Sequence, residues 1–263
     1  RLNWNYRNIY FLEFSGRYDG SSRFAPDNRW GFFPSFSAGY DISRTPYFTK
    51  LNLPVSQLKV RVSYGRLGNQ NGAGLYDYLG VMTLDPNNVN AWLLPGTGNK
   101  PAKGTISLTP KMISPYITWE KVDNANIGLD LMLFDDRLSV TFDAYQRTTK
   151  DMIGPAEAIP AVSGIVPDDR AKINNATLRN RGWELSVSWN DKLKCGFSYG
   201  VGFNVFNYKA VVTKYNNPEG IIYNNHTGLA ANKGYYEGMD IGEIWGYRAD
   251  DLFHKGMLLP LLS

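Results

Sequence analysis

Residues 58–64 read Leu58–Lys59–Val60–Arg61–Val62–Ser63–Tyr64, with apolar and polar side chains in strict alternation. Successive side chains of a β-strand point to opposite faces, so the apolar side chains share one face and the polar side chains share the other. The same alternation recurs at residues 6–18, 32–42, 124–134, 138–145, 183–190 and 197–205, and an eighth stretch begins near Ile241. The chain is therefore predicted to be all-β and antiparallel.

The connections between these stretches are short on one side and long on the other. Residues 134–137 and 190–194 are predicted tight turns, and 43–57 is a longer connection on the same side. The opposite side holds long loops, at residues 19–29, 67–115, 151–176 and 207–235. A soluble antiparallel sheet also alternates, but this asymmetry favours a transmembrane β-barrel with long extracellular loops. No run of about 18 apolar residues predicts a transmembrane helix.

One face of each predicted strand carries no charge, and this fixes the register. A Lys or Arg that faces lipid costs about 2–4 kcal/mol at mid-bilayer, and a slip of one residue would turn a whole strand over. The 17 Tyr and 7 Trp residues are typical of interfacial girdles. A water-soluble β-sandwich stays open as an alternative. The opposite face is predicted to line a watery lumen, with the charged residues Glu13, Arg17, Lys59, Arg61, Asp130, Asp143 and Glu184.

Composition and spacing give no indication of catalysis. The net charge of +4 is mixed along the chain without a basic block, so nucleic-acid binding is not predicted. Cys195 is the only cysteine, so no internal disulfide can form. His226 and His254 have no partner at metal-ligand spacing, and no nucleophile lies near a base. We predict no enzyme activity, no cofactor and no metal.

Binding is the function that remains, and the long loops carry aromatic side chains suited to it. These rings could stack on sugar rings or on peptide side chains. They could equally pack the loops against one another or against a partner that closes over them. The candidate ligand-binding residues are Tyr76, Tyr78, Trp92, Tyr223 and Tyr235.

Several short motifs together resemble one family of membrane receptors. Residues 19–24 read DGSSRF, followed by NRWG at 28–31 and FPS at 33–35. LKVRVSYG at 58–65 precedes GNQ at 68–70, and WEK at 119–121 precedes NIGLD at 126–130 and TKD at 149–151. NRGWE at 180–184 and GEIWGY at 242–247 extend the match. From about residue 3 to residue 253 the chain resembles the SusC/RagA-type TonB-linked outer-membrane receptors.

This resemblance implies part of a plugged barrel of about 22 strands. Residues 1–253 would form seven or eight strands from its second half, and residues 254–263 depart from the family pattern as an atypical tail. No signal peptide opens the chain, so the export signal is expected upstream. The cell outer membrane and its lipid would surround the barrel.

The implied function is TonB-dependent import of oligosaccharides or peptides. A SusD-like surface lipoprotein would close over the outer loops, and the TonB–ExbB–ExbD complex would act through the plug. Three alternatives stay open: a passive porin-like channel, a soluble β-sandwich carbohydrate-binding module, and a surface adhesin that uses the same loops.

Overall fold

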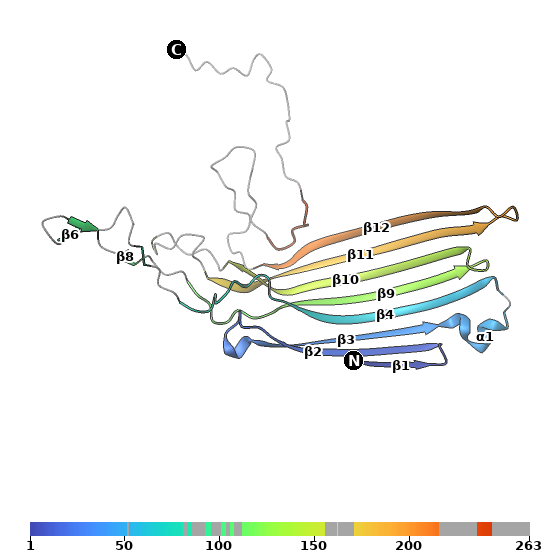
Figure 1. Cartoon of the computed structure of the whole chain (residues 1–263), viewed down its shortest axis with the longest axis horizontal. Helices are drawn as coiled ribbons and strands as arrows, with labels where there is room; N and C mark the ends of the chain where they lie inside the picture. Colours follow the sequence, from blue (N-terminus) through green and yellow to red (C-terminus); the bar gives the residue numbers. More distant parts are fainter. Residues whose placement is uncertain are drawn as a thin grey trace, which may run out of the picture.

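The main feature of the molecule is one antiparallel sheet of eight strands in the order β1-β2-β3-β4-β9-β10-β11-β12 (Figure 1). The computed structural model describes residues 1–51, 53–80, 84–85, 93–95, 101–103, 106–107, 112–155, 162, 171–215 and 236–243. The strands of this sheet are β1 (Leu2–Tyr6), β2 (Tyr10–Gly20), β3 (Trp30–Asp41), β4 (Val55–Asn69), β9 (Glu120–Leu133), β10 (Leu138–Pro155), β11 (Lys172–Lys192) and β12 (Ser198–Tyr215). The predicted all-β, antiparallel fold is confirmed.

Short elements occupy two of the connections. Between β4 and β9, β5 (Leu84–Asp85) pairs with β8 (Ile106–Ser107), and β6 (Leu93–Pro95) pairs with β7 (Pro101–Lys103). The 3-10 helix η1 (Pro26–Asn28) lies between β2 and β3, and η2 (Ile42–Arg44) and α1 (Pro46–Thr49) lie between β3 and β4. In the described part of the chain, no helix has the length and apolar character needed to cross a membrane.

Six of the seven predicted stretches lie within one strand each, apart from at most one residue at an end, and the prediction differs from the structure at both ends of the sheet. Arg7 and Asn8 both have φ of 54°, so they form a turn that separates β1 from β2 where one strand over 6–18 was predicted. The strand predicted near Ile241 is wrong for the described residues 236–243, where Asp240 forms only an isolated bridge to Val211. The eighth strand is β1 instead.

The two ends of the sheet differ as predicted. The β1–β2, β9–β10 and β11–β12 turns lie at the same end as α1, and the long connections leave the other end (Figure 1). Phe134, Asp135 and Asp136 form the β9–β10 turn with φ between 55° and 65°. The turn predicted at 190–194 lies slightly later, because pairing continues to Lys192 opposite Ser198. Cys195 is exposed in this turn.

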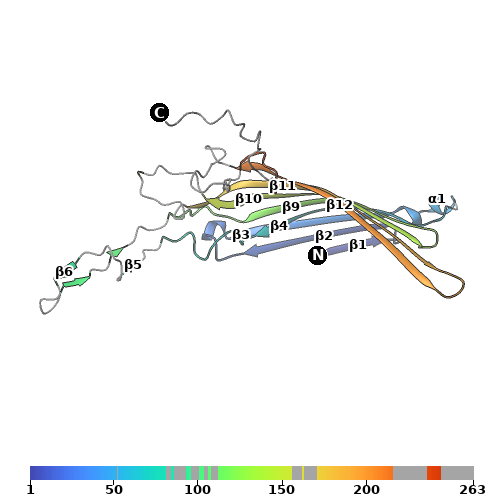
Figure 2. The same cartoon turned by 90° about the horizontal axis from the view of Figure 1, so that it is seen from above.

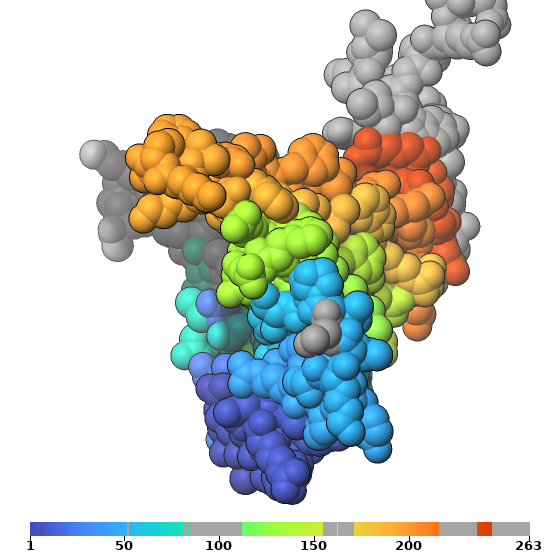
Figure 3. Space-filling model, turned by 90° about the vertical axis from the view of Figure 1, so that its right-hand side faces the viewer, coloured from blue at the N-terminus to red at the C-terminus, as the bar shows by residue number. Residues whose placement is uncertain are grey.

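Apolar residues face apolar residues across every strand pair, which confirms the predicted register. One row that crosses five strands contains Val60, Leu129, Phe142, Leu185 and Val205. The strands follow one another in chain order as a single layer, seen end-on in Figure 3. The sheet is strongly twisted, and β12 diverges from β2 and β3 (Figure 2). No second sheet covers the apolar face in the described residues, so the sandwich alternative is not supported.

The apolar face forms a stripe that is inclined across the sheet. Its limit toward the long loops lies at Tyr18 on β2 and at Tyr64 on β4. On β11 the limit is Trp183, and on β12 it is Val205, which pairs with Leu185 nearer the short turns. The limit therefore moves toward the short-turn end from strand to strand. Barrel strands are tilted by about 35–45° from the bilayer normal, so a horizontal hydrocarbon slab crosses them along such an inclined line.

Candidate functional site

The first part of the candidate site is the polar face of the sheet, opposite the apolar stripe. The seven charged residues predicted for the lumen all lie on this face, since each alternates with apolar residues that are paired across the strands. Lys59 is directly opposite Asp130, and Asp143 is directly opposite Glu184. That this shared face borders the lumen stays a prediction.

Arg61 ties three strands of this face together. Its guanidinium donates to both carboxylate oxygens of Asp130, at 2.7 and 2.9 Å, and to Asp143 Oδ2 at 3.1 Å. Asn126 donates to the other oxygen of Asp143 at 3.1 Å. Arg61 on β4 reaches Asp143 on β10 by crossing β9 at Gly128, where an added Cβ would lie 2.7 Å from Arg61 Cζ. Bidentate charge-assisted bonds fix the geometry of this half-buried group.

The other charged residues of the polar face are held locally. Glu13 pairs with Arg1 at 2.8 Å, and Arg17 pairs with Asp19 at 3.0 Å. Lys59 Nζ lies 4.5 Å from the centre of a phenylalanine ring on β2. A polar hollow lies beside Arg61 along β9, β10 and β11, lined by Asn124, Asn126, Asp143, Tyr145, Arg147 and Glu184. This surface is polar and carries charges of both signs.

The second part of the site is a buried cluster beneath the long loops, formed by Phe24, Phe33, Ala73, Ile117 and Trp119 and called here the loop cluster. The Trp119 ring centre is 5.2 Å from that of Phe24 and 5.4 Å from that of Phe33. Phe24 is fully buried, and Gly31 leaves room for the Phe33 ring, because an added Cβ would approach that ring within 2.6 Å. The cluster joins segments far apart in the sequence at the rim of the sheet.

Hydrogen bonds fasten the DGSSRF loop to this cluster. Trp119 Nε1–H donates to the Arg29 carbonyl at 3.0 Å, and Arg23 Nη1 donates to the Ala73 carbonyl at 2.6 Å. Asn28 Nδ2 donates to the Pro115 carbonyl at 3.1 Å. The motif loop therefore has a structural role in which Arg23 binds a backbone carbonyl. This cluster was not predicted from the sequence, because Phe24 and Ala73 lie in predicted loops, and Ile117 and Trp119 lie between a predicted loop and a predicted strand.

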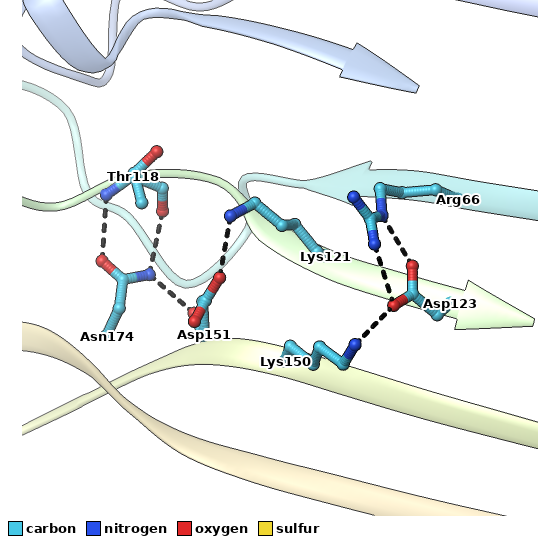
Figure 4. A network of polar contacts seen from close by, with 7 residues as sticks. All are labelled: Arg66, Thr118, Lys121, Asp123, Lys150, Asp151 and Asn174. Atoms are coloured by element: carbon cyan, nitrogen blue, oxygen red, sulfur yellow. Dashed lines mark hydrogen bonds and ion pairs between the residues drawn. The ribbon is translucent and has the colours of Figure 1, made fainter. Parts of the chain in front are cut away.

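A polar network lies beside the loop cluster, on β4, β9, β10 and β11 (Figure 4). Asn174 accepts from Thr118 N at 2.9 Å and donates to Thr118 O at 3.0 Å and to Asp151 O at 2.6 Å. Lys121 Nζ lies 3.0 Å from Asp151 Oδ2. A second group joins Asp123 to Arg66 at 2.6 Å and to Lys150 at 2.9 Å. These contacts carry the strand pairing beyond the apolar stripe, into segments predicted to be loops.

Two of the five candidate ligand-binding aromatics belong to the described residues. Tyr76 and Tyr78 are next to each other in space, with ring centres 6.5 Å apart, and Tyr76 is 56% exposed. Asp77 between them accepts from Gly74 N at 2.7 Å and pairs with Lys172 at 3.0 Å, which anchors this loop to β11. Trp92, Tyr223 and Tyr235 lie outside the described residues, as do both histidines and the predicted tail at 254–263.

The described residues give no indication of a metal site. Among the described residues, no three side chains from His, Cys, Asp and Glu come together in a way that could hold a metal ion. At the rim, the Tyr236 hydroxyl donates to Glu243 at 2.8 Å, and this bond raises the pKa of Tyr236 above its ordinary value.

Comparison with known proteins identifies the family. The family model described as TonB dependent receptor-like, beta-barrel, matches residues 1–246. The chain belongs to this family. It is 29% identical over 255 residues to the TonB-dependent receptor SusC of Bacteroides thetaiotaomicron, and 29% identical over 254 residues to the TonB-dependent receptor P39 of Formosa agariphila. These matches cover 96% and 94% of the chain.

Solved structures agree with this assignment. The RagAB peptide importer in its closed-closed state matches 90% of the chain with a TM-score of 0.71 and 25% identity, and its open-open state matches 89% with a TM-score of 0.69 and 27% identity. The chain spans about a quarter of the length of SusC, 24%, and 21% of P39. The predicted SusC/RagA-type membership is confirmed. The family is one of outer-membrane receptors rather than enzymes, which confirms the prediction of no enzyme activity.

Proposed function

We propose that this chain forms part of the barrel of a TonB-dependent importer in the cell outer membrane. The observation that carries the proposal is the register of the eight-stranded sheet. It keeps an uncharged, aromatic-rich stripe on one face and ion-paired charges on the other, in a chain of the TonB-dependent receptor family. The apolar stripe would contact lipid. The seven charged residues, Arg61 and its partners among them, would line a hydrated path.

The cargo that we propose is an oligosaccharide or a peptide. The solved relative is described as a peptide importer, and another relative is SusC. The loop aromatics Tyr76, Tyr78, Trp92, Tyr223 and Tyr235 would contact this cargo at the mouth. A SusD-like surface lipoprotein would close over the long loops, and the TonB–ExbB–ExbD complex would supply energy through a plug domain. Residues 1–253 would belong to the barrel, with 254–263 as an atypical tail.

Uptake assays test this proposal against its alternatives. Deletion of the full-length gene should abolish growth on one oligosaccharide or peptide fraction as sole nutrient, and removal of TonB should abolish it as well. Growth that persists without TonB would indicate a passive porin-like channel. Lost cell attachment with intact uptake would indicate an adhesin. Purification of the full-length protein without detergent would indicate a soluble carbohydrate-binding module.

Variants at the mouth test the ligand-contact role separately. Tyr76→Ala and Tyr78→Ala should each raise the half-saturating cargo concentration by about two- to tenfold, because one aromatic contact contributes about 0.5–1.5 kcal/mol. Tyr47 is 85% exposed on α1 at the opposite end of the sheet, so Tyr47→Ala is the matched control and should leave uptake unchanged. Equal effects of all three substitutions would contradict a role in cargo contact.

A further inference from the structure

Above the apolar stripe, the lipid-facing side of the sheet becomes basic. On β4, Tyr64 is the last apolar residue of this side, and Arg66 is the next residue with the same orientation. On β11, Trp183 is followed on the same side by Arg181 and then by Arg179. Six cations lie on this side within three same-side positions beyond the limit of the stripe. They are called here the outer basic belt: Arg66, Lys121, Lys150, Arg179, Arg181 and Lys209.

The pairing register makes the belt continuous across strands. Arg181 on β11 lies directly opposite Gln146 on β10 and Lys209 on β12. Arg179 lies opposite Thr148, which in turn is opposite Asp123 on β9. Because residues that are opposite each other share a face, these side chains stand side by side along the upper edge of the stripe.

The belt keeps a positive balance after its internal ion pairs are counted. Arg66 and Lys150 both pair with Asp123, and Lys121 pairs with Asp151 at 3.0 Å (Figure 4). Lys209 pairs with Asp240 at 2.9 Å. Six cations against three carboxylates leave a formal charge of +3. Arg181 donates only to the neutral Gln146 side chain, at 2.6 Å, and the described residues include no carboxylate paired with Arg179.

We infer that the outer basic belt binds phosphate-bearing lipid headgroups of the leaflet on the long-loop side. This inference rests on the proposed placement of the apolar stripe in the bilayer. A guanidinium presents a planar pair of donors that matches a phosphate, and Lys and Arg at a membrane surface attract anionic lipids. Arg179 and Arg181 are the centre of the site, because no carboxylate neutralises them within the described residues.

The position of the belt favours a lipid over a protein as its partner. The belt begins one residue pair beyond the last lipid-facing apolar residues, Trp183 on β11 and Tyr64 on β4. This is the depth at which headgroups meet the hydrocarbon in a bilayer. A protein partner would have to displace lipid to reach it, whereas a lipid with its chains against the stripe would place its phosphate there.

The test uses the full-length protein purified in detergent, with diphosphorylated lipid A as the probe and native mass spectrometry as the readout of binding. The variant is Arg179→Gln combined with Arg181→Gln. The control is Arg147→Gln, which removes one guanidinium at the same level of the sheet, whereas the double variant removes two. Arg147 lies on the polar face, where it donates to Asn124 Oδ1 at 3.1 Å. Retained heat-modifiable migration in gels verifies that each variant is folded.

The double variant should raise the dissociation constant for lipid A by about tenfold or more, and Arg147→Gln should change it by less than about twofold. Arg179→Gln combined with Arg181→Lys should bind lipid A more tightly than the double variant does, because a positive charge remains at position 181. Dephosphorylated lipid A should bind the wild type as weakly as lipid A binds the double variant. Any of three results would overturn the inference. The double variant could bind lipid A as tightly as the wild type, the control could lose as much affinity as the double variant, or inorganic phosphate at the lipid concentration could compete fully. Failure of the proposed function would instead appear as intact uptake without TonB or as absence from the outer membrane.

Discussion

The loop cluster gives a sharp prediction, because two adjacent phenylalanines of β3 face opposite sides of the sheet. Phe33 is 4% exposed and packs edge-on against Trp119, whereas Phe32 is 56% exposed on the side of the apolar stripe. Replacing a buried phenylalanine by alanine costs about 3–5 kcal/mol through lost burial and the cavity left behind. Phe33→Ala should remove this free energy from the packing that holds the DGSSRF loop, and Phe32→Ala should not.

Hydrogen–deuterium exchange of the full-length protein measures this difference locally. Within the loop, Ser21 N–H donates to the Arg29 carbonyl at 3.1 Å, and Asn28 N–H donates to the Ala25 carbonyl at 2.9 Å. A loss of about 3 kcal/mol should speed exchange in peptides covering 21–29 by about a hundredfold, since about 1.4 kcal/mol corresponds to a factor of ten. Phe32→Ala should leave these peptides as protected as in the wild type.

Two results would refute this reasoning. Unchanged protection of 21–29 in Phe33→Ala would mean that the loop is held by its hydrogen bonds alone. Equal loss in both variants would mean that the strand itself has been destabilised rather than the cluster. Peptides from the β9–β10 turn provide the internal reference, because they lie at the opposite end of the sheet.

Two further predictions concern the faces and the ends of the sheet. Leu185 lies in the apolar stripe, so Leu185→Arg should destabilise the full-length barrel in lipid vesicles by about 2–4 kcal/mol, measured by urea titration. Ser186 lies on the polar face, so Ser186→Arg should destabilise the barrel far less. A larger loss for Ser186→Arg would mean that the two faces are assigned the wrong way round. A membrane-impermeant maleimide should label Tyr76→Cys on intact cells. It should label Asp136→Cys and the native Cys195 only after the outer membrane is opened. Labelling of these two positions on intact cells would mean that the barrel has the opposite orientation.

The strands and their two faces could be predicted from the sequence because both are local properties. A period of two residues assigns each side chain to a face without reference to any other strand, so all seven charged residues predicted for the polar face lie together there. The prediction was wrong at the ends of the sheet. Arg7 and Asn8 form a turn where one continuous strand was predicted, and within the described residues 236–243 only Asp240 forms a bridge to the sheet.

The amino-acid sequence by itself determined the fold class, the strand register, the contrast between short and long connections, and the family. Only the tertiary structure decided which side chains meet. Arg61 reaches Asp143 because pairing places β9 between their strands and Gly128 leaves the space, and Phe24 meets Trp119 across almost a hundred residues of chain. Such contacts depend on which strands become neighbours and on where a long connection returns, and no local alternation carries that information. The same reason explains why the outer basic belt emerges only when the rows of paired residues are followed from β4 to β12.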